Sequence, residues 1–142
     1  MFIMRHIYLS LLLISLCALT SQARTTWPVA SPEVRDLAAQ EMIENHANYI
    51  AVYTKGLVCS SCGIGLRIHI SKIDSVDQSA FKKGVDLDSE KQLVYVAFKA
   101  GAEIDAEAVR EAIYKAGYDP AHYYLWSEAG GITKTAYSTT EE

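Results

Sequence analysis

The sequence has few cysteines, few prolines and no cluster of basic residues. Its 142 residues include three cysteines and three prolines, and 13 Lys and Arg stand against 17 Asp and Glu. No basic group is larger than the pair Lys82 and Lys83. The chain therefore lacks the charge pattern of a nucleic-acid-binding surface and of a helix that lies on a membrane. It also lacks a pattern of residues typical of acid–base catalysis, so we expect a protein that is not an enzyme.

A hydrophobic run near the N-terminus predicts a signal peptide. Residues 7–19 carry no charge, Arg5 precedes them, and Ser21-Gln22-Ala23 follows them, as in a secretory signal with its cleavage site. The run is shorter than the ~20 apolar residues that cross a bilayer, which disfavours the alternative of an uncleaved membrane anchor. We expect residues 1–23 to be removed on export, so that the protein is periplasmic or secreted and no segment remains inserted in a membrane.

Cleavage also changes the charge and the cysteine count. Removal of Arg5 leaves 12 basic against 17 acidic residues, a net charge of about −5. Removal of Cys17 leaves two cysteines, Cys59 and Cys62, in a C-x-x-C spacing. A disulfide between them would close too small a loop to stabilise a fold. The cysteine pair is therefore a candidate for chemistry rather than for a structural framework.

Hydrophobic periodicity predicts one domain of alternating strands and helices between two extensions. Residues 24–48 form an N-terminal extension with a helix from Pro32 to about Asn48, and residues 127–142, rich in Gly, Ser, Thr and Glu, are expected to be a flexible tail. The segments between them read in order as strand, helix, strand, strand, helix, strand. They cover residues 49–54, 63–72, a strand within 76–87, and then 93–98, 105–116 and 118–126. This order predicts an α+β fold, a four-stranded antiparallel sheet with two helices on one face.

The expected position of the cysteines favours binding of a soft metal ion. Cys59 lies in the loop after the first strand, and Cys62 lies at the start of a helix, where the helix dipole lowers the pKa of a thiol. Soft ions such as Cu(I) prefer thiolate ligands, whereas a structural zinc ion needs four ligands. His69 is two helical turns beyond Cys62, and His46 and His122 are distant in sequence, so we expect none of them to complete a zinc site.

Two other interpretations of the cysteine pair stay open. The C-x-x-C spacing is also that of thiol–disulfide exchange proteins, although the order of elements differs from that of thioredoxin and the central residues are Ser60 and Ser61. The pair could also form an inert disulfide after export. Met42 is the single methionine that remains after cleavage, which makes the site unlike a methionine-rich copper site and keeps the redox alternative open.

Two separated motifs resemble the heavy-metal-associated domain family, which includes copper chaperones and the periplasmic mercury-binding protein. The motifs are GLVCSSC at residues 56–62 and AIYKAGY at residues 112–118, and the resemblance covers about residues 49–126. It implies a ferredoxin-like βαββαβ fold that binds one soft ion, Cu(I) or Hg(II), through Cys59 and Cys62. It also implies a monomer that exchanges the ion with a metal-donor or metal-acceptor protein, a transporter or a chaperone.

The resemblance extends to the residues around the metal loop. Tyr118 matches the position whose side chain approaches the metal in the family, and Ser60 and Ser61 separate the two ligands. Leu57 stands where the family usually has methionine, a nearly volume-conserving exchange. Two further departures are a longer segment at residues 76–85 and the helix within residues 24–48. The function implied is sequestration or relay of the ion by thiolate exchange.

Overall fold

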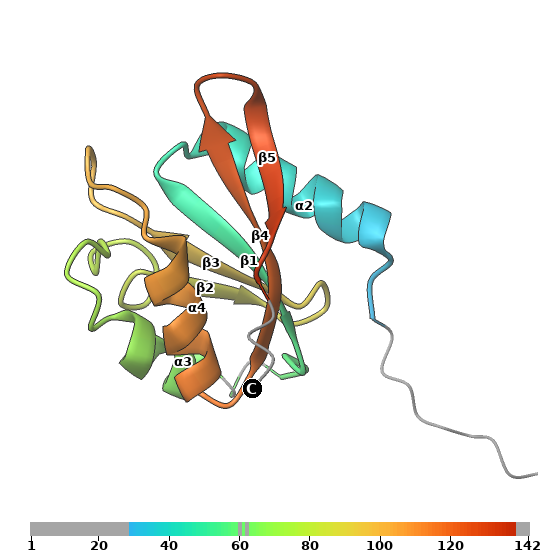
Figure 1. The fold of residues 1–142 in the computed structure, drawn as a ribbon. Helices are drawn as coiled ribbons and strands as arrows, with labels where there is room; N and C mark the ends of the chain where they lie inside the picture. Colours follow the sequence, from blue (N-terminus) through green and yellow to red (C-terminus); the bar gives the residue numbers. More distant parts are fainter. Residues whose placement is uncertain (1–28, 60, 62, 139–142) are drawn as a thin grey trace, which may run out of the picture.

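The computed structural model describes residues 29–59, 61 and 63–138. The predicted signal peptide, Ser60 and Cys62 lie outside this part of the chain. The described elements are α2 (Pro32–Asn45), β1 (Tyr49–Lys55), α3 (Gly63–Ile70), β2 (Val85–Asp88), β3 (Leu93–Ala97), α4 (Ala106–Lys115), β4 (Asp119–Ser127) and β5 (Gly131–Ala136) (Figure 1). From β1 to β4 the order of strands and helices is the predicted one.

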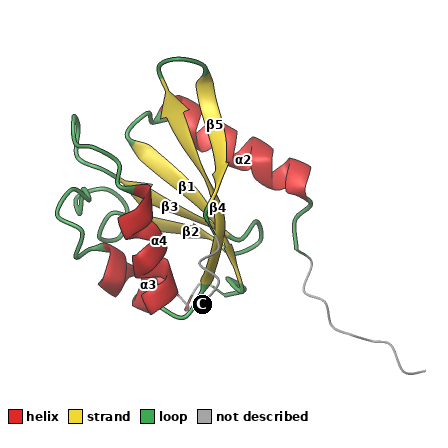
Figure 2. Ribbon diagram, viewed as in Figure 1, coloured by secondary structure: helices red, strands yellow, loops and turns green. Residues whose placement is uncertain are grey.

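The strands form one antiparallel sheet in the order β2-β3-β1-β4-β5. The α+β class is confirmed, but the prediction of four strands is wrong because the sheet has five. Helices α3 and α4 cover one face, and α2 lies on the opposite face (Figure 2). The sheet is therefore the middle layer between two unlike helical layers.

The layer under α3 and α4 is an aliphatic core. Alternate residues of β1 and β3 point into it, among them Ile50, Val52, Val94 and Val96, and each of these four is fully buried. The helices contribute Leu66, Ile70, Val109 and Ile113. Because successive residues of a strand point to opposite faces, the remaining residues of the same strands face α2.

The layer under α2 mixes apolar and polar groups. Ala39 and Ile43 of the helix pack on Ala51, Leu93, Tyr95 and Tyr124 of the sheet. Arg35 is buried at the same interface, where its guanidinium donates hydrogen bonds to the carbonyls of Lys91 and Ala30, both at 3.0 Å. The guanidinium also lies 3.7 Å from the centre of the Tyr53 ring. Polar contacts therefore help to hold α2 on the sheet.

Both long helices begin at side-chain caps. The Oγ atom of Ser31 accepts a hydrogen bond from Val34 N at 3.4 Å, and Pro32 is the first residue of α2. The carboxylate of Asp105 accepts one from Ala108 N at 2.8 Å. Helix α2 ends at Asn45, a few residues before the predicted end at about Asn48.

The segment expected to be a flexible tail supplies the fifth strand. Strand β5 pairs with β4 from Ser127↔Gly131 to His122↔Ala136. Tyr137 then crosses to α4, where its hydroxyl donates a hydrogen bond to Ala106 O at 3.0 Å. Threonine is a favourable strand residue, but the Gly- and Glu-containing surroundings hid this signal. Residues 131–137 are therefore part of the folded unit.

The second strand is shorter than the predicted segment. Strand β2 covers Val85–Asp88, and the preceding residues form turns in which Phe81, Lys83 and Gly84 have positive φ. A Cβ at Gly84 would lie 2.9 Å from Asp77 O, so the turn needs glycine both for its φ and for space. The additional length noted in the sequence is thus a turn region before a short edge strand.

Candidate functional site

The cysteine loop leaves the sheet through a glycine and is anchored by a buried leucine. Gly56 follows β1 with φ +83°, a conformation that glycine adopts easily. Leu57 is fully buried in the core under α3 and α4, while Val58 is 45% exposed. Leu57 therefore anchors the loop two residues before Cys59. A methionine at this position would have a similar volume and could anchor the loop in the same way.

Cys59 is half-buried and is in a disulfide. Its Sγ atom lies 3.2 Å from the hydroxyl of the exposed Ser61. The other two candidate residues of the loop, Ser60 and Cys62, lie outside the described residues. A sulfur held in a disulfide is not a thiolate, so binding of a metal ion by Cys59 requires reduction first.

Helix α3 begins at Gly63, the residue that follows Cys62 in the chain, and it packs closely on β2. A Cβ at Gly63 would collide with the side chains of Leu87 and Arg67. Arg67 thus folds back over the first turn of its own helix, and its Nε is buried without a hydrogen-bond partner in the described part of the chain. The start of α3 therefore combines a tight glycine contact with a nearby positive charge.

Tyr118 lies beside the base of the cysteine loop. It lines a cavity of about 650 Å³ together with Lys55, Gly56, Tyr114, Gly117 and Asp119. Pairing of Lys55 with Asp119 between β1 and β4 brings the two segments together, and their side chains form an exposed ion pair at 3.2 Å. Tyr118 therefore lies beside Gly56, the residue that precedes Leu57 in the cysteine loop.

The histidines do not gather around Cys59. His46 is exposed at the end of α2, His69 is half-buried on α3, and His122 is half-buried on β4. Among residues 29–59, 61 and 63–138 no three His, Cys, Asp or Glu side chains come together to hold a metal ion.

Within the described residues, none of the helices has the length and apolar character that a bilayer crossing requires.

A polar network between α2 and the sheet was missed at the sequence level. Tyr124 donates a hydrogen bond to Asp36 and lies 2.9 Å from His122 Nε2, and Lys134 Nζ lies 2.8 Å from Asp36. Burial raises the pKa of Asp36, but the hydrogen bonds from Lys134 and Tyr124 outweigh it and the net shift is downward. Burial, together with the charge of Lys134, lowers the pKa of His122 to about 4.

The network joins residues 88 and 98 positions apart in the chain. Local periodicity carries no signal for such distant pairs, although the two-residue period of a strand places His122 and Tyr124 on one side of β4.

Comparisons with known proteins do not assign the chain to a family. No family model, curated protein or solved structure matches it.

Proposed function

We propose that the protein is an exported soft-metal carrier with a ferredoxin-like fold of the heavy-metal-associated type, carrying Cu(I) or Hg(II) on Cys59 and Cys62. The observation that carries the proposal is the position of Cys59 in the loop between β1 and α3, with α3 beginning at Gly63. A helix start beside a thiol favours its thiolate form, and thiolates are preferred ligands of soft ions.

The surroundings of the loop support this proposal. Leu57 anchors the loop in the core, and Tyr118 lines the cavity at its base. The positive charge of Arg67 lies near the start of α3, where it would favour a negatively charged bis-thiolate complex. The half-buried Cys59 remains accessible enough for a partner's thiolate to reach the ion.

Transfer of the ion would proceed by ligand exchange. An incoming thiolate of the donor or acceptor protein binds the two-coordinate ion, and then one resident cysteine leaves. The ion keeps its oxidation state, and the protein contributes position and accessibility rather than catalysis. Sequestration uses the same complex without the second protein.

The disulfide of Cys59 favours a second candidate function, thiol–disulfide exchange. In that reaction a partner's thiolate attacks the disulfide, the partner dithiol is oxidised, and the cysteine pair is reduced. The same residues would serve, but a metal ion would not be needed.

Titration of the fully reduced protein with Cu(I) against a chromophoric chelator distinguishes the two. We expect one tightly held equivalent, its loss in Cys59→Ser/Cys62→Ser, and its retention in Ser61→Ala, a matched change in the same loop. Absence of competition by the reduced protein contradicts the copper carrier. Retained binding in the double variant shows that the cysteine pair is not the site.

The reduction potential tests the alternative. In a redox protein, replacement of Ser61 between the two cysteines should change the potential, whereas a metal site should tolerate this small polar substitution. A changed potential together with absent Cu(I) binding supports thiol–disulfide exchange.

A further inference from the structure

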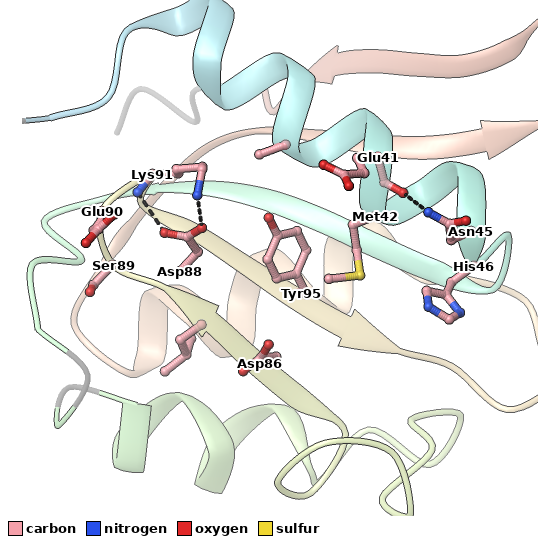
Figure 3. Close-up of a pocket in the computed structure, with 12 residues that line it drawn as sticks. Glu41, Met42, Asn45, His46, Asp86, Asp88, Ser89, Glu90, Lys91 and Tyr95 are labelled. Atoms are coloured by element: carbon pink, nitrogen blue, oxygen red, sulfur yellow. Dashed lines mark hydrogen bonds and ion pairs between the residues drawn. The ribbon is translucent and has the colours of Figure 1, made fainter.

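A second cavity lies on the α2 side of the sheet, at the edge made by β2. Its volume is about 710 Å³, within the usual range for sites that bind small molecules. The lining residues are Ala38, Glu41, Met42, Asn45 and His46 of α2 and its end, Asp86, Leu87 and Asp88 of β2, the turn residues Ser89, Glu90 and Lys91, and Tyr95 of β3 (Figure 3). Three elements thus contribute to one depression.

The charges that line this cavity are mainly negative. Four carboxylates, those of Glu41, Asp86, Asp88 and Glu90, stand against the ammonium of Lys91. Lys91 is already paired with Asp88, at 2.6 Å. Within the described residues, the other three carboxylates form no ion pair. The cavity therefore carries a net negative charge. The ion pair of Lys91 with Asp88 shows that an ammonium group can bind to one of its carboxylates.

Tyr95 is a largely buried residue whose hydroxyl lines the cavity. The residue is only 5% exposed, and its hydroxyl makes no hydrogen bond to another residue in the described ranges. In Figure 3 its ring lies between Asp88 and Met42. Burial and the charges of Asp88, Asp86 and Glu41 raise the pKa of Tyr95, so the hydroxyl stays protonated. The hydroxyl is open to the cavity, because the single fully buried side-chain nitrogen or oxygen without a partner in the described chain is Nε of Arg67. A ligand in the cavity could therefore reach the hydroxyl of Tyr95.

The mixture of groups indicates an organic cation rather than a metal ion. No three acidic, His or Cys side chains of the described chain converge as metal ligands. Met42 and Ala38 add apolar surface, and the ring of Tyr95 offers a π face, which attracts cations. A ligand with an ammonium group and a short apolar body would satisfy both the charge and the apolar wall.

We propose that the cavity between α2 and the β2–β3 hairpin binds a small organic ammonium ion, with Glu41 and Asp86 supplying charge and Tyr95 accepting a hydrogen bond from the ammonium. This site is separate from the cysteine loop and does not depend on the proposed metal function. The bound cation would bridge α2 to the edge strand β2.

The test uses three probes of equal chain length, hexylammonium, hexanol and hexanoate, titrated into the ¹⁵N-labelled protein. We expect hexylammonium to shift the amide signals of Met42, Asp86 and Tyr95 in a saturable manner, and the neutral and anionic probes to leave them unchanged. Equal shifts with hexanol would show an apolar pocket without cation selectivity and would overturn the proposal, as would no shift with any probe.

Variants identify the residues that bind. Glu41→Gln/Asp86→Asn should weaken hexylammonium binding roughly tenfold, since two partly exposed charge interactions together correspond to about that factor. Tyr95→Phe keeps the ring and should weaken binding severalfold. Glu44→Gln removes a charge from the same helix outside the cavity and should have little effect. If Glu44→Gln weakens binding as much as the double variant, attraction is general to the acidic surface and the site is refuted.

A final arm distinguishes two sources of the ammonium group. Nα-acetyl-lysine methylamide presents the same group on a peptide backbone. Tighter binding of this probe than of hexylammonium supports a lysine side chain of another protein as the natural ligand, and weaker binding supports a free amine. Both results require loss of affinity in Glu41→Gln/Asp86→Asn.

Discussion

The two faces of the sheet are held by different kinds of contact. Under α3 and α4 the buried cluster is aliphatic apart from one phenylalanine, so its stabilisation comes from apolar burial, which has no directional requirement. Under α2 the helix is held by fewer apolar residues together with Arg35 and the network of Asp36, Tyr124, His122 and Lys134. Hydrogen bonds and ion pairs require defined geometry and protonation.

The two faces of the sheet therefore support different features of the chain. The face under α3 and α4 supports the cysteine loop through Leu57, and its buried cluster contains no ionisable side chain. The α2 face carries the acidic cavity and depends on charged groups. We therefore expect changes in pH and in single polar groups to alter stability through the α2 face. Changes in side-chain volume should lower stability most in the core under α3 and α4.

The largest effect is expected from a cavity in the aliphatic core. Leu66 of α3 is fully buried, so Leu66→Ala should lower the free energy of unfolding by about 2–5 kcal/mol. The control is Ile64→Ala on the same helix, because Ile64 is 66% exposed and should change stability by about 0.5 kcal/mol or less. Urea denaturation measures both. Similar losses in the two variants would contradict the described orientation of α3.

The second effect is a pH dependence that arises on the α2 face. Burial and the charges of Lys134, Arg35 and Lys55 lower the pKa of His122 to about 4, while Asp36 acts in the opposite direction. The unfolded chain binds a proton at this residue below a pKa of ~6.5, whereas the folded protein binds it only near pH 4. Stability should therefore fall as the pH drops from about 6.5 to about 4, by at most ~3 kcal/mol.

Urea denaturation between pH 4 and pH 7 measures this dependence. His122→Gln should flatten the curve over that window, and His46→Gln should leave the slope unchanged because His46 is exposed. An unchanged slope in His122→Gln would assign the pH dependence to other groups.

A smaller effect is expected from one hydroxyl of the same network. Tyr124→Phe removes the hydrogen bond to the carboxylate of Asp36, and hydrogen bonds to charged groups contribute about 2 kcal/mol. Tyr114→Phe is the matched control, since Tyr114 is 70% exposed on α4. Thermal and urea unfolding at pH 7 should separate the two variants. Equal stability of Tyr124→Phe and the parent protein would mean that the network does not stabilise the α2 interface.

The smallest effects compare the caps of the two helices. Asp105→Ala removes the cap with the shorter hydrogen bond, 2.8 Å, and should cost about 1 kcal/mol, whereas Ser31→Ala removes a cap at 3.4 Å and should cost about 0.5 kcal/mol. Circular dichroism with urea unfolding measures both. A larger loss for Ser31→Ala would reverse the expected order and show that α2 depends more on its cap than α4 does.

Local patterns predicted most of the central elements but not the periphery of the sheet. The continuous apolar run at residues 93–97 and the capped, amphipathic segment after Asp105 correspond to β3 and α4. In strand β5 only Gly131 and Ile132 are partly buried, and the other four residues are exposed. The segment therefore shows little hydrophobic alternation. Its stability comes from backbone pairing with the long strand β4, which a single segment of sequence does not reveal.

The cysteine loop could be predicted from the sequence, whereas the cavity at Tyr95 and the network of Asp36 could not. Spacing and a nearby helix start made Cys59 a candidate from the sequence. The cavity around Tyr95 combines residues of α2, β2 and β3, and the network of Asp36 combines α2, β4 and β5. Such groupings arise only when distant segments pack together, so no local motif could have indicated them.

The pairing of β5 with β4 determines where the protein can be shortened. A fragment that ended at residue 126, where the sequence suggested the end of the domain, would lose β5 and leave the outer backbone groups of β4 unpaired. An uncovered strand edge of this length readily pairs with a second molecule. Fragments for crystallisation or for fusion to another protein should therefore extend through Tyr137, whose hydroxyl ties the end of this strand to α4.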